Sequence, residues 1–324
     1  TLTGSRRPMR APQSGKALFD RAEAMGLLSS DPLGEGRFVN LLQNYLPKLA
    51  IKNLSPLIDS LRALKSPAEI KLLRRAGKLT ALAVIEAMRS TEVGVMEYQL
   101  DAVPKYIYRV NGARGEGYPS IIAGGVNMQY GHYERKDCVL NDGDIVLMDH
   151  AADYGYYTSD IGRVWPVNGK YSPWQRELYG FMVKYHKAVI KRIRPGVTPE
   201  QIMDGARAEM EEVLKNTKFS KPIYEKAARS TGGHMSHAVG MQVHDVGGPR
   251  GPLKPGTVFA VDPQMWVREK NLYIRIEDTV LVTEDGVEIL TGSAPWELDD
   301  VEKLMKEEGI LQKYPPVFGA REKP

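Results

Sequence analysis

Four β-type apolar runs in this chain each meet an acidic residue, and this pattern limits the folds and sites that the chain can form. A carboxylate buried at the end of an apolar strand is costly unless it is paired or binds a cation. One such acid alone is usually a strand-end cap or a salt bridge, but Arg163 and Arg275 are the only cations in these runs. The set therefore favours a divalent metal site; its members are Asp149 after Val146–Met148, Asp160 before Ile161, Asp262 after Val258–Val261, and Glu277 after Tyr273–Ile276.

Histidines supply the other candidate groups of the predicted site. They are His132, His234, His237 and His244, the last three within residues 233–245. Imidazole combined with carboxylates is a common ligand set for zinc, cobalt, iron and manganese. Cys138 is the only cysteine, which excludes a disulfide within the chain and a cysteine-based zinc site. We expect His150 and His186 to lie outside the site.

Three predicted helix starts share one capping pattern, with Ser or Thr at the cap, Pro next, and Glu or Gln three residues after the cap. The cap hydroxyl can accept from an unpaired amide, the third side chain can reach back, and Pro has no amide to satisfy. The pattern predicts helices that begin at Pro67, Pro173 and Pro199, the first ending near Arg89 and the second near Ile193. The β-type runs lie at residues 145–148, 156–167, 257–261 and 272–282.

The order of two helices followed by strands occurs twice. Two seven-residue segments, Gly94–Leu100 and Gly196–Ile202, have the same residue, Gly, Val or Gln, at three matching positions and end in an aliphatic residue. We interpret this echo as an internal duplication, in which two ααβ halves of an α+β domain pack their strands together and leave a cleft between them. The predicted division is a partial N-terminal domain or lobe at 1–62, a catalytic domain at 63–292, and a C-terminal segment at 293–324 with a helix from Trp296 to Glu308.

Composition argues against two other classes of partner. Charged residues make up 26% of the chain and hydrophobic residues 42%, and no run approaches the roughly 18 apolar residues that a membrane-spanning helix needs. The net charge of +4 comes from Lys and Arg scattered among nearly as many acids, without a basic stripe interleaved with aromatics. We expect no membrane partner and no nucleic acid partner. A cytoplasmic location and a homo-oligomer, specifically a dimer, are further expectations.

The order of these motifs resembles that of the pita-bread metallopeptidases, which include aminopeptidase P, prolidase (Xaa-Pro dipeptidase) and methionine aminopeptidase. The resemblance runs from about Ser66 to about Leu290. It implies the pita-bread (creatinase/aminopeptidase) fold, which also has two duplicated halves. The matching segments are Asp149 and Asp160 with ten residues between them, Ser236–Gly240, Val243–Asp245, Val261–Pro263 and Ile274–Asp278, and His132 matches a substrate-side histidine of the proline-directed branch.

The resemblance implies a role for each acidic residue and for one histidine. Asp149 would bind one metal ion, Asp160 and Glu277 would bridge two ions, and His237 with Asp262 would complete the second position. The expected cofactors are therefore two divalent metal ions. Manganese is the first choice, with zinc, cobalt and iron as alternatives.

The implied reaction is hydrolysis of an X–Pro peptide bond in a proline-containing peptide, by an aminopeptidase or by a dipeptidase. A hydroxide bridging the two metal ions would attack the scissile carbonyl. His132 and His244 would bind substrate, stabilise the tetrahedral intermediate and help deliver a proton to the leaving nitrogen. A metal-free branch resembling creatinase is an alternative, but that branch largely lacks the acids. A non-catalytic peptide-binding relative with a weakened metal site is a second alternative.

Three positions depart from the family pattern. Asp262 stands where the family usually has Glu, and its side chain is one methylene shorter, which weakens the prediction of a second metal ion. Gly233 stands where the family usually has a histidine, four residues before His237. Residues Gln264–Trp266 replace the usual Gly-x-Tyr. We expect the substrate pocket to differ from that of typical members.

Overall fold

The computed structural model of the chain describes residues 32–232 and 235–317. The chain divides into two compact units, residues 1–57 and 58–324; the three-part division inferred from the sequence stays a prediction. In the first unit, helix α2 (Pro32–Tyr45) packs Leu41 against Phe38. Helix α3 (Ser55–Ala63) ends in the second unit, which contains the residues of the predicted site.

The three predicted helix starts are confirmed. At the first, the Ser66 amide donates to Glu69 Oε2 (2.8 Å) and the Glu69 amide donates to Ser66 Oγ (3.4 Å). Thr198 and Gln201 form the same reciprocal pair. These local bonds satisfy amides that have no partner within a helix. The described helices of the second unit are α4 (Pro67–Ser90), α5 (Glu97–Val110), α6 (Pro173–Ile190), α7 (Pro199–Lys215), α8 (Pro222–Ser230), α9 (Leu298–Leu304), α10 (Ile310–Lys313) and the 3₁₀ helices η1 (Gly125–Gln129) and η2 (Arg268–Lys270).

A seven-stranded antiparallel sheet runs through the second unit, in the order β2-β3-β5-β10-β7-β6 with β11 beside β10. Strands β5 and β10 join its two halves, and Glu277 of β10 pairs with Gly162 of β5. Two short pairs, β1 with β4 and β8 with β9, lie outside this sheet. The strands are β1 (Gly115–Glu116), β2 (Ile121–Gly124), β3 (Ile145–Asp149), β4 (Ala152–Asp153), β5 (Ile161–Pro166), β6 (Met235–Ala238), β7 (Val258–Val261), β8 (Gln264–Val267), β9 (Leu272–Arg275), β10 (Glu277–Val282) and β11 (Val287–Ile289).

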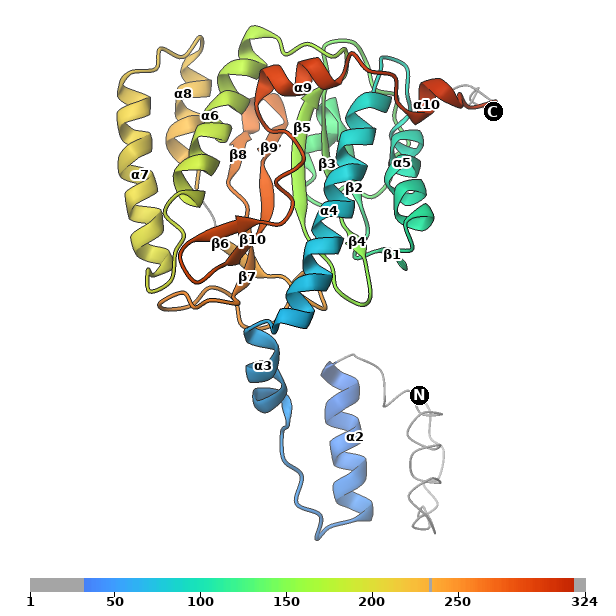
Figure 1. Cartoon of the computed structure of the whole chain (residues 1–324), viewed down its shortest axis with the longest axis vertical. Coiled ribbons are helices and arrows are strands. Elements are labelled where there is room, and N and C mark those ends of the chain that lie inside the picture. The colour runs from blue at the N-terminus through green and yellow to red at the C-terminus, as the bar shows by residue number, and fades with distance from the viewer. Residues whose placement is uncertain (1–31, 233–234, 318–324) are drawn as a thin grey trace, which may run out of the picture. The chain divides into compact units, whose positions relative to one another are not determined.

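Each half of the sheet is preceded in sequence by its own helices, as the repeated order predicts. Helices α4 and α5 precede β2, β3 and β5, whereas α6, α7 and α8 precede β6, β7 and β10. Figure 1 shows α5 at the right and α7 and α8 at the left, with the strands between them. The sequence echo has a structural counterpart, because Gln99 accepts from the Met96 amide (2.9 Å) as Gln201 accepts from the Thr198 amide (3.0 Å).

Two predicted strands are shorter or divided in the structure. The run at 156–167 is a strand only over β5, because Tyr156 adopts a positive φ of 69° in the turn that precedes it. The run at 272–282 is divided at Ile276, where the chain changes partners: β9 pairs with β8, whereas β10 pairs with β7 and β5. Both interruptions lie beside a predicted acidic ligand.

The predicted helix from Trp296 to Glu308 is also shorter than expected, since α9 ends at Leu304. The Trp296 ring lies 5.4 Å from the guanidinium carbon of Arg163, and its centroid lies 5.4 Å from that of the His186 ring. This packing on buried groups holds Trp296 before the helix rather than within it.

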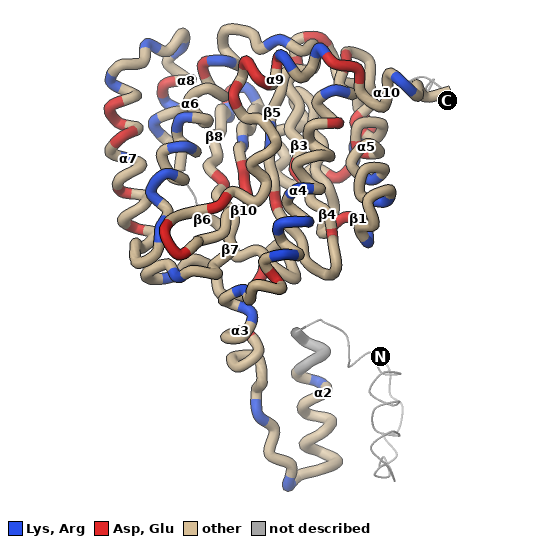
Figure 2. Tube along the Cα trace, in the orientation of Figure 1, with Lys and Arg blue, Asp and Glu red and all other residues tan. Residues whose placement is uncertain are grey.

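Charges of both signs are mixed along the helices of the second unit, as Figure 2 shows for α4, α6 and α7. This distribution agrees with the scattered charge seen in the sequence. Within residues 32–232 and 235–317, no helix combines the length and the apolar character that a membrane span requires.

Candidate metal and active site

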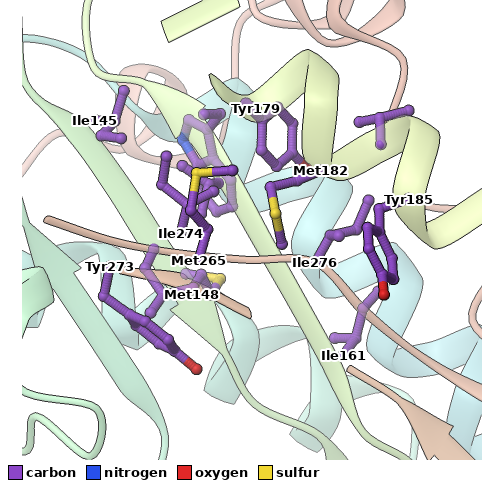
Figure 3. Packing of buried hydrophobic residues seen from close by; sticks show 14 of the residues in the cluster. Ile145, Met148, Ile161, Tyr179, Met182, Tyr185, Met265, Tyr273, Ile274 and Ile276 are labelled. Carbon is purple, nitrogen blue, oxygen red and sulfur yellow. The ribbon is translucent and has the colours of Figure 1, made fainter. Parts of the chain in front are cut away.

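The four predicted acids lie where strands begin or end. Met148, Ile161 and Ile276 are each next to one of these acids in sequence, and they point into the apolar core (Figure 3). Because neighbouring residues of a strand point to opposite faces, the acids point away from that core. They are Asp149 at the end of β3, Asp160 before β5, Asp262 after β7 and Glu277 at the start of β10, and each is at most 4% exposed.

Three of the predicted ligands converge in an arrangement that suits a bound cation. His237 Nε2 lies 3.3 Å from Asp160 Oδ2 and 3.9 Å from Glu277 Oε1. One ligand atom of each residue lies within 4.8 Å of the other two. Both carboxylate oxygens of Glu277 are buried, and neither accepts a hydrogen bond from the described residues. Two carboxylates and an imidazole are a ligand set that fits a divalent metal ion. The fit is supported by Glu277, whose buried carboxylate has no hydrogen bond to offset its burial.

The guanidinium of Arg275 holds the other two predicted ligands. Its Nε and Nη2 donate to the two oxygens of Asp262, each at 2.8 Å, and its Nη1 donates to Asp149 Oδ2. Gln264 Nε2 also donates to Asp262 Oδ2 (2.6 Å). Arg275 Nε lies 3.2 Å from Glu277 Oε2. Asp149 and Asp262 thus lie outside the three-residue cluster, and Arg275 holds an oxygen of Asp149 and both oxygens of Asp262.

Tyr118 links the two sets of ligands. Its hydroxyl lies within hydrogen-bonding distance of Asp149 Oδ1 (2.7 Å) and of Asp160 Oδ1. A hydroxyl has one hydrogen to donate, so the second contact needs a proton on a carboxyl group. Burial raises the pKa of Asp149 to about 7, although the charge of Arg275 opposes the rise. Asp149 therefore takes up a proton more readily than an ordinary aspartate.

Burial and neighbouring charges also control the cluster of three. Burial raises the pKa of Glu277 well above its usual range, against the charge of Arg275. At Asp160 burial also acts to raise the pKa, but the hydrogen bond from His237, the charges of Arg275 and His237 and the hydrogen bond from Tyr118 together outweigh it, so the pKa is lowered. At His237 burial acts to lower the pKa, but the hydrogen bond and charge of Asp160, the Ala238 carbonyl and the charge of Asp262 together outweigh it, so the pKa is raised. Since the pKa values of Glu277 and His237 are both raised, a cation at these residues would compete with protons for them.

This electrostatic arrangement predicts that the metal-free protein loses stability as the pH rises. The pKa of Asp149, about 7, and that of Glu277 lie above the ordinary values of 3.8 and 4.5. A carboxyl group whose pKa is higher in the folded than in the unfolded protein stabilises the folded state fully at pH values below its unfolded pKa. This contribution is lost as the pH rises through its folded pKa. We expect the metal-free protein to melt at a lower temperature near pH 8 than near pH 5, and manganese to raise the melting temperature more near pH 8. Calorimetry with EDTA or manganese measures both, and a metal-free protein that gains stability toward pH 8 would contradict the account.

The two predicted substrate-side histidines lie beside this cluster. The ring centroids of His237 and His244 are 4.0 Å apart. Burial and the charge of His237 lower the pKa of His244, and the nearby charge of His132 adds to this effect. His132 and His244 are both exposed. The lowered pKa keeps His244 neutral near pH 7, so that its ring can donate one hydrogen bond and accept another.

The other histidines belong elsewhere. His186 Nε2 lies 2.8 Å from Asp278 Oδ2, and Arg163 donates to the other oxygen of Asp278. Arg163 therefore neutralises Asp278 rather than any of the four predicted acids. His150 is also buried and lies outside the three-residue cluster. Residues 233–234, which include the departure from the family pattern at position 233, lie outside the described part of the chain.

Sequence reasoning missed the structural roles of Tyr118, Gln264 and Glu97. Tyr118 lies in a short segment without periodicity, and Gln264 is visible in the sequence only as a departure from the family. Glu97 holds the loop that carries His132 although it lies 35 positions earlier in the chain. Its fully buried carboxylate accepts hydrogen bonds from the side chains or amides of Gly124, Asn127, Tyr133 and Cys138. No local sequence signal indicates these long-range partners.

One family of known proteins matches most of the chain, since the profile of metallopeptidase family M24 covers residues 71–284. Xaa-Pro aminopeptidase 3 of Rattus norvegicus is 38% identical over 272 residues, which are 79% of this chain and 54% of that protein. Xaa-Pro aminopeptidase of Haemophilus influenzae is 36% identical over 268 residues, which are 77% of this chain and 62% of that protein. The chain thus spans less than two thirds of the length of these curated relatives.

A solved structure of a related protein has the same fold. Proline aminopeptidase P II from Yersinia pestis superposes with a TM-score of 0.76 at 30% identity, over 89% of this chain and 75% of that one. The duplicated helices and strands described above form the pita-bread fold that the sequence predicted. The sequence match, the fold and the arrangement of the acidic residues agree: the chain belongs to metallopeptidase family M24.

Proposed function

We propose that this chain hydrolyses X–Pro peptide bonds with two divalent cations held by Asp149, Asp160, His237, Asp262 and Glu277. The observation that carries the proposal is the convergence of Asp160, His237 and Glu277 around buried oxygens that accept no hydrogen bond from the described residues. The names of the relatives, Xaa-Pro aminopeptidase, supply the type of bond. Manganese is our first candidate, because oxygen and imidazole ligands suit it.

The chain's own residues would bind and orient the substrate and move the proton. Bound cations would supply a water that ionises near neutral pH and would polarise the scissile carbonyl. His244, neutral near pH 7, would donate a hydrogen bond to the carbonyl oxygen as negative charge develops there. The leaving nitrogen of an X–Pro bond carries no hydrogen, so it must gain a proton as it departs. His132, which is exposed and close enough to His244 to lower its pKa, would deliver that proton.

A panel of peptides tests the proposed substrate and its length. The peptides are the dipeptide Ala-Pro, the tripeptide Ala-Pro-Ala and a longer Ala-Pro peptide, each assayed with manganese, zinc, cobalt or iron and analysed by mass spectrometry. Release of the first residue from the longer peptides indicates an aminopeptidase, and cleavage of the dipeptide alone indicates a dipeptidase. No hydrolysis of any peptide with any of these metals would overturn the proposal.

One observation favours a second candidate, a non-catalytic peptide-binding protein. Both oxygens of Asp262 are already engaged by Arg275 and Gln264, which is the state expected of a weakened metal site. Such a protein would retain less than about one equivalent of divalent metal on purification and would gain no activity on metal addition. It would still bind X–Pro peptides.

Asp262→Glu separates these candidates most sharply. The extra methylene restores the reach of the usual family residue and moves the carboxylate out of the geometry that Arg275 and Gln264 hold. We expect the second cation to bind about tenfold more tightly and the activity to rise. About tenfold is a typical effect of changing a group that surrounds a bound metal ion. Isothermal titration with manganese measures the affinity, with the exposed Asp285→Glu as control. Weaker binding in Asp262→Glu would show that the site is built around aspartate.

A further inference from the structure

The segment that carries His244 is folded back on the strand that carries His237. The Asp245 amide donates to the Ala238 carbonyl (2.9 Å). His237 and His244, each one residue before this pair, are therefore brought together by the folded segment. We call residues 237–247 the histidine hairpin. The His244 ring makes no side-chain hydrogen bond with the described residues, so the placement of its backbone and its contact with the His237 ring position it.

A buried ion cluster connects the histidine hairpin to the chain that enters α4. Lys65 Nζ donates to Asp245 Oδ2 (3.1 Å) and to the Arg62 carbonyl (2.8 Å), and Arg62 Nη2 donates to Asp245 Oδ1. The side chains of Lys65 and Asp245 are each only 1% exposed. Lysine is rarely buried to this extent unless it is paired. Buried ion pairs add little net stability compared with apolar packing, so this cluster calls for a role beyond stability.

Two glycines allow the hairpin and the entering chain to touch. Gly247 has a positive φ of 76°, and a Cβ there would lie 2.4 Å from the Cβ of Ala63. At Gly240, a Cβ would lie 1.9 Å from Asp245 Oδ2 and 2.9 Å from Lys65 Cε. These distances are too short for any side chain. The fit is therefore specific to glycine at both positions.

The histidine hairpin also contacts the metal ligands. The Thr158 amide donates to the Gly240 carbonyl (2.9 Å) two residues before Asp160, and the His244 ring lies against that of His237. A displacement of Asp245 would thus move His244 directly, whereas the Asp160 amide and carbonyl are bonded to Thr279 of β10 and His237 lies within β6.

We propose that Asp245, clamped by Arg62 and Lys65, is a positioning residue that sets the location of His244 in the active site. The proposal rests on the proposed function, in which His244 contacts the reacting carbonyl. The chain that enters α4 then acts on the reaction through Asp245.

Three substitutions test this role by kinetics. We expect Asp245→Asn, Lys65→Met and Arg62→Met to lower kcat by at least about tenfold, within the range known for groups that orient an active-site residue. KM and the dissociation constant for manganese should stay within about twofold of wild type. Arg62→Lys, which keeps the charge, should recover most of kcat. The single substitutions at positions 62 and 65 keep the test open if Asp245→Asn does not fold.

Thr91→Val is the control for a general loss of stability. It removes a buried hydrogen bond from Trp165 Nε1 (2.9 Å) in a part of the sheet away from the histidine hairpin. We expect a lower melting temperature and an unchanged kcat. An unchanged kcat in the folded variants at positions 62, 65 and 245, or an equal loss of kcat in Thr91→Val, would overturn the proposal.

An NMR measurement keeps the positioning role separate from the proposed reaction. The chain has six histidines, so the imidazole signals of His244 can be assigned by comparison with His244→Gln. We expect one sharp set of His244 signals in the wild type and broadened or multiple sets in Asp245→Asn, even if no X–Pro peptide is cleaved. Unchanged His244 signals in Asp245→Asn would overturn the positioning role. A wild type with sharp signals and no hydrolysis would overturn only the reaction.

Discussion

Glu277→Gln is expected to abolish peptide hydrolysis and to make the stability of the metal-free protein depend less on pH. Glu277 belongs to the three-residue cluster, and its two buried oxygens accept no hydrogen bond from the described residues. Gln keeps the shape of Glu277 but cannot supply a charged oxygen to a cation. We therefore expect activity to fall by more than about 100-fold, which exceeds the usual effect of changing a group that only supports a metal ligand. Burial raises the pKa of Glu277, so its ionisation costs stability as the pH rises; Gln does not ionise, and the melting temperature in EDTA should fall less between pH 5 and pH 8 than that of the wild type.

The combination of these two effects distinguishes a metal ligand from a structural residue. Neutralising an acid that only pairs with a cation lowers stability, whereas neutralising a ligand without its metal removes a loss of stability toward high pH. The exposed Glu284→Gln serves as control and should change neither quantity. Activity near the wild-type level in Glu277→Gln would contradict the two-cation mechanism.

Arg275→Met is expected to cause the largest loss of stability in the metal-free protein. Arg275 is 8% exposed and pairs with Asp149, Asp262 and Glu277. Removal of one partner from a buried ion pair costs about 3–5 kcal/mol because the remaining charge is uncompensated. Excess manganese should restore part of this loss, by about 2.7 kcal/mol at 100 times the dissociation constant. Urea unfolding with EDTA and with manganese measures both free energies.

An exposed arginine on the same unit provides the matched control. Arg74 pairs with Glu288 at 2.7 Å, with half of the Arg74 side chain exposed, and Arg74→Met should change the free energy of unfolding by at most about 1 kcal/mol. An Arg275→Met protein as stable as the control in EDTA would contradict the role of Arg275 as the cation that neutralises Asp149 and Asp262.

Features that depend on local chemistry were predictable from the sequence. The helix starts at Ser66 and Thr198 follow from side chains three residues apart that satisfy each other's amides. The acids at strand ends were predictable because apolar runs define the strands and a buried acid is conspicuous within them. The family resemblance ordered these acids into a site before their distances were known.

Features that depend on long-range partners were not predictable. Tyr156 reads as part of a strand, but its positive φ places it in a turn. Trp296 reads as the start of a helix, but its ring packs on Arg163. The sequence shows Arg275 as a cation near the acids. Its hydrogen bonds to both Asp149 and Asp262 depend on the pairing of strands distant in sequence. Each of these outcomes was decided by tertiary contacts that override local preference.

The most direct test of metal-dependent X–Pro hydrolysis uses a matched pair of peptides, Ala-Pro-Ala and Ala-Ala-Ala. The purified chain is treated with EDTA, dialysed and titrated with manganese while bound metal and released alanine are measured together. We predict that Ala-Pro-Ala is cleaved, that EDTA removes this activity, and that it returns as manganese fills the site, with little cleavage of Ala-Ala-Ala. Cleavage that survives metal removal, equal cleavage of the two peptides, or no cleavage of either Ala-Pro-Ala or the dipeptide Ala-Pro by the manganese-loaded protein would contradict the account.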